Sequence, residues 1–337
     1  MAETEDQLAA LRREIDAVDT KLHDLLMQRT ELAVRVGEVK AKSQPIGRSP
    51  RDGAKFVRPA REAQILRRLA QRHHGKLPKG VVVRMWREMI SALLQVEGPF
   101  VVAVYTPADQ PGYWDLARDH YGAKVPLHGF DRLSHAISAV IEGQATVAIL
   151  PLPHEDDRDP WWRRIAVRQP NVPHVIARLP FGDPGNQRGR GLQGLVIGTA
   201  ACEPTGNDRS LLVAEASHPI SRSTMRDALN QAGLTPVFVQ AFQELGGPEQ
   251  HLLGQKRTEA AGAVAHGAVV HAPAPPGLVG EHLEQHPVVD PDRLLEPDRV
   301  VDARATGRDL ELLDLPEPRP EVGDVGEPAA VGRPGKV

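Results

Sequence analysis

The first forty residues of the chain alternate apolar and polar positions with the period of an α-helix. Leucine, isoleucine and valine recur three or four positions apart, at Leu8, Leu11, Ile15, Val18, Leu22, Leu25, Leu26, Leu32, Val36 and Val39. Thr4 and Gln7 fit a capping box at the start of this pattern, and neither glycine nor proline interrupts it before Gly37. The pattern predicts a helix of roughly 38 residues, longer than is typical of globular proteins, so we expect it to pack against another helix.

A loop and two shorter helices follow the long one. Prolines and glycines mark the loop at Pro45, Gly47, Pro50 and Gly53. Proline is tolerated in the first turn of a helix, so Pro59 is expected to open the second helix, PAREAQILRRLAQRHH. An apolar face predicts the third helix over residues 79–97. An all-α unit of three helices is therefore expected over residues 5–98.

The hydrophobic period changes after residue 98. FVVAVYT and ATVAILPL are typical of strands, and YWDLARDHYG and DRLSHAISAVIEG of helices, which predicts an α/β segment over residues 99–180. LVIGTA, SLLVAEA and TPVFVQAF with the helix SRSTMRDALNQAG predict a second, small α/β segment over residues 192–245. No aromatic residue occurs after Leu253, while Pro, Gly, Ala, Val, Asp and Arg dominate, so residues 250–337 are expected to be a disordered tail.

Composition limits the classes of function. The 337 residues exceed the usual size of one domain. The net charge of −3 gives no overall basic field of the kind that attracts nucleic acid, and no apolar run is long enough to cross a membrane. We therefore expect a soluble cytoplasmic protein that binds neither nucleic acid nor membranes. The single cysteine, Cys202, has no partner for a disulfide or a cysteine-based zinc site and is expected to be an ordinary thiol.

Two basic side chains of the long helix are placed to converge. Arg29 and Lys40 are eleven residues apart, so they point within about 20° of each other and lie about 16 Å apart along the axis. Arg12 is about 25 Å and 100° away from Arg29, too far to share a small ligand with it inside one chain. Arg12 could instead serve the site of a neighbouring copy.

Carboxylates on the two shorter helices complete a candidate pocket. Ile90, Leu93 and Glu97 follow a 3, 4 spacing, so Glu97 ends an apolar stripe and is expected to be partly buried. Glu62 lies beside Arg61 at the start of the second helix. Converging cations with two carboxylates indicate a site for a small, multiply anionic molecule that bears a hydroxyl. The alternative for any one of these charged residues is a solvated helix face.

The segments LRREIDAVDTKLHDLLMQRTELAVRVGEVK, PAREAQILRRL and MWREMISALLQVEG together resemble the all-helical (type II) chorismate mutases, over about residues 8 to 98. The resemblance implies that three helices interlock with those of a second copy as a homodimer, and that Arg12 crosses into the partner's site. It also implies that Arg12 and Arg29 bind the two carboxylates of chorismate, while Lys40 contacts its ether oxygen and one carboxylate. Glu97 would face the ether oxygen from the other side.

The same resemblance assigns the remaining site residues. Arg61 would be a supporting cation, and Glu62 would hold the ring hydroxyl. The chain departs from the family at Arg58, where Asp is common, and at Leu93, where a small Ser is common. Each departure could alter hydrogen bonding to the substrate without removing the cations.

The reaction implied is the rearrangement of chorismate to prephenate, a step of phenylalanine and tyrosine biosynthesis. It is intramolecular, so neither a metal nor a cofactor is expected; a rigid cationic pocket selects the reactive conformer and stabilises charge on the breaking C–O bond. Glu97 must be protonated to donate a hydrogen bond. Burial would raise its pKa and the nearby cations would lower it, and both outcomes remain open at this point.

The α/β segments are similar to the second half of bifunctional chorismate mutase/prephenate dehydratases. AISAVIEGQATVAILPLPHE is similar to the dehydratase lobe, and the second segment to a small regulatory (ACT-like) fold. The expected Thr-Arg-Phe motif is not recognisable, because HVIARLPF has Ala177 before Arg178 and Leu179 after it, and the regulatory Glu-Ser-Arg-Pro motif is missing. We therefore expect a degenerate module without dehydratase activity. A bifunctional enzyme is one alternative, and a non-catalytic sensor of an aromatic-pathway acid is another.

Two further motifs have plain structural explanations. Gly189, Gly191 and Gly194 spell GxGxxG but precede a strand, the reverse of a dinucleotide-binding fingerprint. WWRR at residues 161–164 could stack on nucleic-acid bases but is more typical of a core and its rim.

Overall fold

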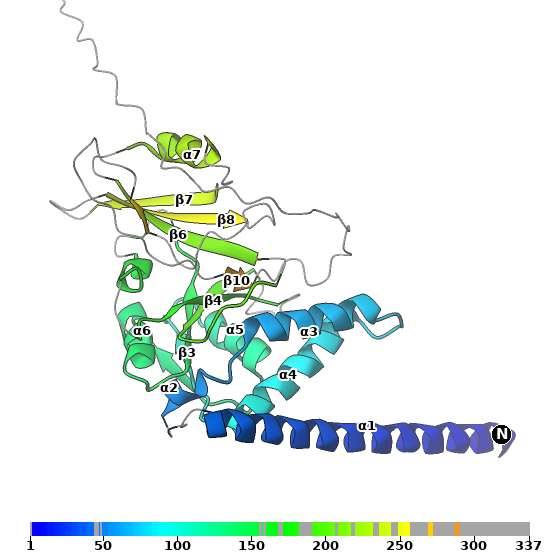
Figure 1. The fold of residues 1–337 in the computed structure, drawn as a ribbon. Coiled ribbons are helices and arrows are strands. Elements are labelled where there is room, and N and C mark those ends of the chain that lie inside the picture. The colour runs from blue at the N-terminus through cyan, green and yellow to red at the C-terminus, as the bar shows by residue number, and fades with distance from the viewer. Residues whose placement is uncertain are drawn as a thin grey trace, which may run out of the picture.

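The structure is a computed structural model. It describes residues 2–43, 47, 49–154, 157, 160–167, 171–181, 191–205, 208–216, 220–231, 236–243, 249–256, 269–271 and 287–289. Within them, helices lie at the N-terminal end of the chain, and a sheet with flanking helices follows (Figure 1). No helix in this described part of the chain combines the length and the apolar character needed to cross a membrane.

Three long helices form as their periodicity predicts. They are α1 (Ala2–Ser43), α3 (Pro59–Arg72) and α4 (Lys79–Glu97). Helix α1 begins at Ala2, so Thr4 lies inside it and the predicted capping box is wrong. Part of the predicted loop is also helical, because Ser49 and Asp52 form a capping box that starts the short helix α2 (Pro50–Gly53).

Helix α1 makes few contacts with the rest of its own chain. It packs on α4, and its N-terminal part projects beyond α3 and α4 (Figure 1). The two helices approach closely at Gly37, where an added Cβ atom would lie 3.8 Å from the Glu97 Cα atom. Most of the apolar stripe of α1 is exposed, with Leu25 60% and Ile15 58% accessible. A helix with this exposed apolar face lacks the packing that normally stabilises it.

The α/β part begins with three parallel strands. They are β1 (Val102–Tyr105), β2 (Leu127–Phe130) and β3 (Val147–Pro151), with β1 paired to both others. Helices α5 (Gly112–Tyr121) and α6 (Leu133–Ile141) connect them. Strand β5 (Gly194–Gly198) runs antiparallel between β3 and β4 (His174–Leu179). The short 3₁₀ helix η1 (Trp161–Arg164) buries Trp161 and Trp162, so WWRR contributes to the core as predicted.

The sheet continues into the second part of the chain. Strand β8 (Glu249–Lys256) lies between β6 (Asp208–Ala216) and β7 (Pro236–Gln243) and runs antiparallel to both, and α7 (Arg222–Gln231) packs on β7. The short strands β9 (Val269–His271) and β10 (Pro287–Val289) pair with β6, and β10 also pairs with β4. The described strands lie in the order β2-β1-β3-β5-β4-β10-β6-β8-β7, with β9 beside β6.

The structure corrects two predicted boundaries. β5 lies in the sheet of the first α/β segment, although the hydrophobic pattern assigns its residues to the second segment. The predicted tail from residue 250 contains β8, because Leu252 and Leu253 are almost fully buried against neighbouring strands. Apart from β8, β9 and β10, residues 250–337 lie outside the described residues, as does Gly189 of the GxGxxG motif.

The helical part shares its hydrophobic core with the sheet. Leu66 of α3 and Val83 of α4 belong to one buried cluster with Val104 of β1, Leu116 of α5 and Ile176 of β4. The helical unit predicted over residues 5–98 is therefore joined to the α/β part by packing as well as by sequence.

Candidate functional site

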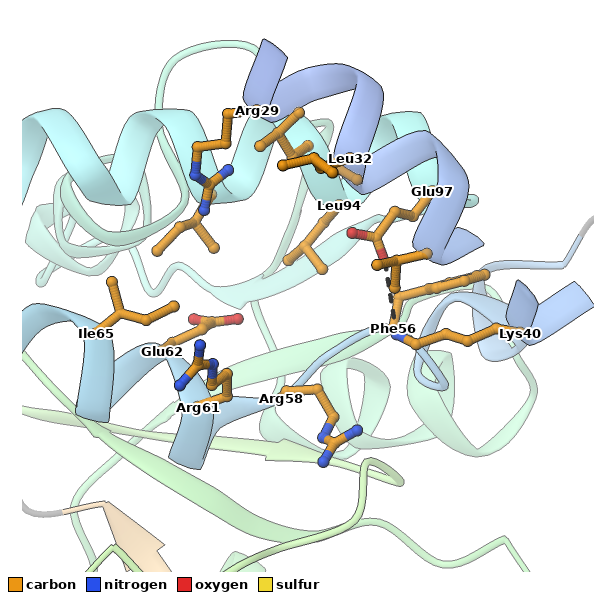
Figure 2. A pocket seen from close by; sticks show the side chains of 14 residues that line it. Arg29, Leu32, Lys40, Phe56, Arg58, Arg61, Glu62, Ile65, Leu94 and Glu97 are labelled. Carbon is orange, nitrogen blue, oxygen red and sulfur yellow. Dashed lines mark ion pairs between the residues drawn. The ribbon is translucent and has the colours of Figure 1, made fainter. Parts of the chain in front are cut away.

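A cavity of about 550 Å³ lies between α1, α3 and α4 (Figure 2). Its wall combines apolar side chains with four basic and two acidic ones: Arg29, Leu32, Ala33, Val36, Lys40, Phe56, Arg58, Arg61, Glu62, Ile65, Ile90, Leu93, Leu94 and Glu97. A volume of this size suits a small metabolite. The cavity brings together the two cations of the first helix and the two carboxylates that the sequence singles out.

The α1 wall supplies Arg29 and Lys40. They line the same cavity, as their helical spacing predicts, and Arg29 points from α1 toward α3 (Figure 2). Burial lowers the pKa of Arg29, and the charge of Glu97 opposes that shift. The ordinary pKa of an arginine is so high that Arg29 keeps its positive charge at neutral pH despite this shift.

Glu97 and Lys40 close one end of the cavity. The Lys40 Nζ atom lies 3.6 Å from the Glu97 Oε2 atom and 4.9 Å from the centre of the Phe56 ring. Burial raises the pKa of Glu97, and the nearby charges of Lys40 and Arg29 only partly oppose this. Of the two opposing effects that the sequence leaves open, burial is the stronger, so Glu97 takes up a proton more readily than an ordinary glutamate.

Glu62 stands at the opposite wall, in the first turn of α3. It is 8% exposed, and its Oε2 atom accepts a hydrogen bond from the Arg87 Nη1 atom at 2.5 Å. The sequence did not single out Arg87. A signal was present, because Val83, Arg87, Ile90 and Leu94 are buried on α4 at a 4, 3, 4 spacing, which places one charge inside an apolar stripe.

The remaining predicted residues occupy different positions. Arg61 and Leu93 line the cavity. Arg58 also lines it but forms an ion pair with Glu203 of the α/β part. Arg12 is exposed on the projecting part of α1 and is absent from the described residues that line the cavity. The cavity of one chain therefore contains every predicted site residue except Arg12.

This arrangement suits recognition of a small polyanion. Basic side chains approach from α1 and α3 (Figure 2). Ile90, Leu93 and Leu94 of α4 add apolar side chains to the cavity wall. Charged hydrogen bonds surrounded by apolar walls are strong, because little water competes for them. No cluster of His, Cys, Asp and Glu suited to a metal ion occurs among the described residues.

Comparison with known proteins supports the resemblance seen in the sequence. Residues 11–98 match the model of the family "Chorismate mutase type II". The bifunctional chorismate mutase/prephenate dehydratase of Pseudomonas aeruginosa is 32% identical over 151 residues, which cover 44% of this chain and 39% of that protein. The protein of the same name from Aquifex aeolicus is 36% identical over 103 residues, 30% of this chain and 27% of that protein. The chain thus spans well under half the length of these relatives.

A solved structure also shows a remote likeness. The X-ray structure of prephenate dehydratase from Streptococcus mutans has 13% sequence identity and a TM-score of 0.34, covering 47% of this chain and 82% of that one. The similarity to chorismate mutases is therefore a similarity of sequence, over residues 11–98 of the helical part.

Proposed function

We propose that this protein rearranges chorismate to prephenate in the cavity between α1, α3 and α4. One observation carries the proposal: residues from three separate helices, predicted as a substrate site from the sequence, line one small cavity. They include Arg29 and Lys40 from α1, Glu62 from α3 and Glu97 from α4. The match of residues 11–98 to the chorismate mutase family supports the same reaction.

The cations would orient the substrate and stabilise its transition state. Arg29 is placed to bind a carboxylate, and Lys40 to donate a hydrogen bond to the ether oxygen, where negative charge builds as the C–O bond breaks and a C–C bond forms. The cavity would select the compact conformer in which the reacting carbons meet, which removes much of the entropic barrier. All atoms stay in one molecule, so the chain needs only to bind, orient and donate hydrogen bonds.

Glu97 would be the second donor to the ether oxygen. Its raised pKa supports this role, because only the protonated carboxyl can donate a hydrogen bond. Glu97 pairs with Lys40 in the structure. An anionic substrate would bring further negative charge close to Glu97 and favour protonation, while Lys40 turns to the substrate.

A second copy of the chain would complete the site. The exposed apolar residues Leu11, Ile15, Val18, Leu22 and Leu25 follow a 4, 3, 4, 3 spacing along α1, and Arg29 continues the same line four residues later. This spacing is that of helices that pack together along their length. A partner helix on this stripe would reach the cavity and could bring its own Arg12 to it.

Turnover of chorismate tests the proposed reaction. Adding the purified full-length protein to chorismate should remove the chorismate absorbance, and nuclear magnetic resonance should identify prephenate as the product. Binding of chorismate without conversion would overturn the proposal in favour of a sensor. Formation of phenylpyruvate from prephenate would add a dehydratase activity. The relatives are named as bifunctional enzymes with this second activity. The replacement of the expected Thr and Phe on either side of Arg178 argues against it in this chain.

A further inference from the structure

We propose that Arg87 is a positioning residue that holds the Glu62 carboxylate in place to receive a hydroxyl group of the substrate. The inference rests on the proposed function, because it assigns a task to Glu62 within that site. Arg87 would act through Glu62, and it would make recognition of the hydroxyl depend on the α/β part of the chain.

The first step of the argument is the burial of the pair. Arg87 is 2% exposed and Glu62 8% exposed, and their side chains form a hydrogen-bonded ion pair. A carboxylate offers about four lone-pair sites, so the bond from Arg87 leaves acceptor capacity for a ligand hydroxyl. Because Glu62 lines the cavity, a carboxylate fixed on one side presents the rest of its acceptors in a defined direction.

The second step is the way Arg87 itself is fixed. Its Nε atom donates to the His120 backbone oxygen at 3.0 Å, and its Nη2 atom lies 2.6 Å from the His120 Nε2 atom. Arginine only donates, so His120 must accept through Nε2 and carry its proton on Nδ1. Burial, with a smaller contribution from the Arg87 charge, lowers the pKa of His120 well below its usual range and so keeps this neutral form.

The third step links the pair to the α/β part. His120 belongs to α5, and Phe181 follows β4. The Arg87 guanidinium lies 5.5 Å from the centre of the Phe181 ring and 5.9 Å from that of Tyr121. Arg87 thus contacts α3 on one side and the α/β part on the other. A planar guanidinium can serve these partners together, whereas the point charge of a lysine cannot.

Ligands that differ only in the hydroxyl provide the test. The probe is an oxabicyclic dicarboxylate shaped like the rearranging conformer of chorismate, made with and without its ring hydroxyl. Calorimetry gives both dissociation constants for the full-length wild-type protein and for Arg87→Lys. The dissociation constant of the hydroxylated probe should rise about tenfold, the scale of one charged hydrogen bond, and that of the deoxy probe should stay unchanged.

Arg84→Lys is the matched control. Arg84 also extends from α4 to α5, where its Nη2 atom donates to the Asp119 Oδ1 atom at 2.8 Å. Its side chain is exposed, and it bonds to Asp119 instead of Glu62. Its replacement should change neither dissociation constant. If Arg87→Lys does not fold, His120→Phe takes its place, because it keeps a buried ring while removing the Nε2 acceptor, and it should show a smaller rise for the hydroxylated probe alone.

The outcomes separate this inference from the proposed reaction. Equal weakening of both probes, or of neither, would overturn the role of Arg87 even in a protein that converts chorismate. Selective weakening in a protein that binds the probe without converting chorismate would support Arg87 and overturn the mutase proposal. A wild-type protein that binds neither probe would overturn both.

Discussion

The two carboxylates of the cavity are held in different ways. Glu97 pairs with Lys40 at 3.6 Å, and the Lys40 side chain is 30% exposed. Glu62 pairs with Arg87 at 2.5 Å, and the Arg87 side chain is 2% exposed. The Glu62 side rests on a shared core with the α/β part, whereas the Lys40 side depends on α1, most of whose apolar stripe is exposed.

This difference separates two tasks within one site. The Glu62 side is preorganised by its own chain, since the buried Arg87 guanidinium fixes the geometry of the Glu62 carboxylate before any ligand arrives. The side formed by α1 has less packing within its own chain and, in our proposal, is completed by a second copy. Changes on the α1 side should therefore affect the chemical step, and changes on the Glu62 side should affect recognition of the substrate.

Lys40→Ala should have the largest effect. It removes a donor that our proposal places on the breaking bond, worth about 3 kcal/mol of transition-state stabilisation, so kcat should fall on the order of a hundredfold. Lys42→Ala serves as control, since Lys42 is exposed in the same last turn of α1. Steady-state kinetics with thermal unfolding checks both variants. An unchanged kcat in Lys40→Ala would remove Lys40 from the mechanism.

Glu97→Gln should change the pH dependence. A protonated donor is present below its pKa and is lost as the pH rises through it, so the wild-type kcat should fall on the alkaline side. Because burial raises the pKa of Glu97, this fall begins at a higher pH than for an ordinary glutamate. Glutamine donates at every pH, so the variant should lose this limb.

The control for this prediction is Glu88→Gln on the same helix. Glu88 accepts a hydrogen bond from the Ala123 backbone amide, and its replacement should leave the alkaline limb in place. The measurement is kcat between about pH 5 and 9. An identical limb in wild type and Glu97→Gln would show that another group titrates.

Glu203→Gln should have the smallest effect. Glu203 pairs with Arg58 at the edge of the cavity, and both side chains are nearly half exposed. Such pairs contribute less than about 1 kcal/mol to the free energy of unfolding. Releasing Arg58 toward the cavity should lower the KM for chorismate by less than about threefold, measured by initial rates. A rise in KM would show that Glu203 supports binding.

The sequence predicts the parts of the site whose geometry is set within one helix. Arg29 and Lys40 converge because the pitch of a helix fixes their directions, and Glu97 is partly buried because it ends an apolar stripe. Arg87 was missed, since its meaning depends on His120 and Phe181, which only tertiary folding brings to it.

Strand prediction failed where the alternation of apolar and polar residues is weak. β2 has the sequence LHGF with exposed His128 and Gly129, and β8 is rich in polar residues, so neither shows a clear period of two. Both are strands because neighbouring strands pair with them. β5 is different, because LVIGTA predicts a strand there, but its place in the sheet depends on long-range pairing with β3 and β4.

In our proposal, a second copy of the chain completes the α1 side of the site. A heterodimer made from two inactive variants is the most direct test of this proposal. Arg12→Ala and Lys40→Ala chains carrying different tags are co-expressed, and the mixed species is purified on both tags. One of its two sites then has an intact Lys40 and receives an intact Arg12 from the partner, so the heterodimer should show roughly half of the wild-type rate, while each parent alone stays nearly inactive. A heterodimer no more active than its parents, or failure to recover a mixed species, would contradict the account.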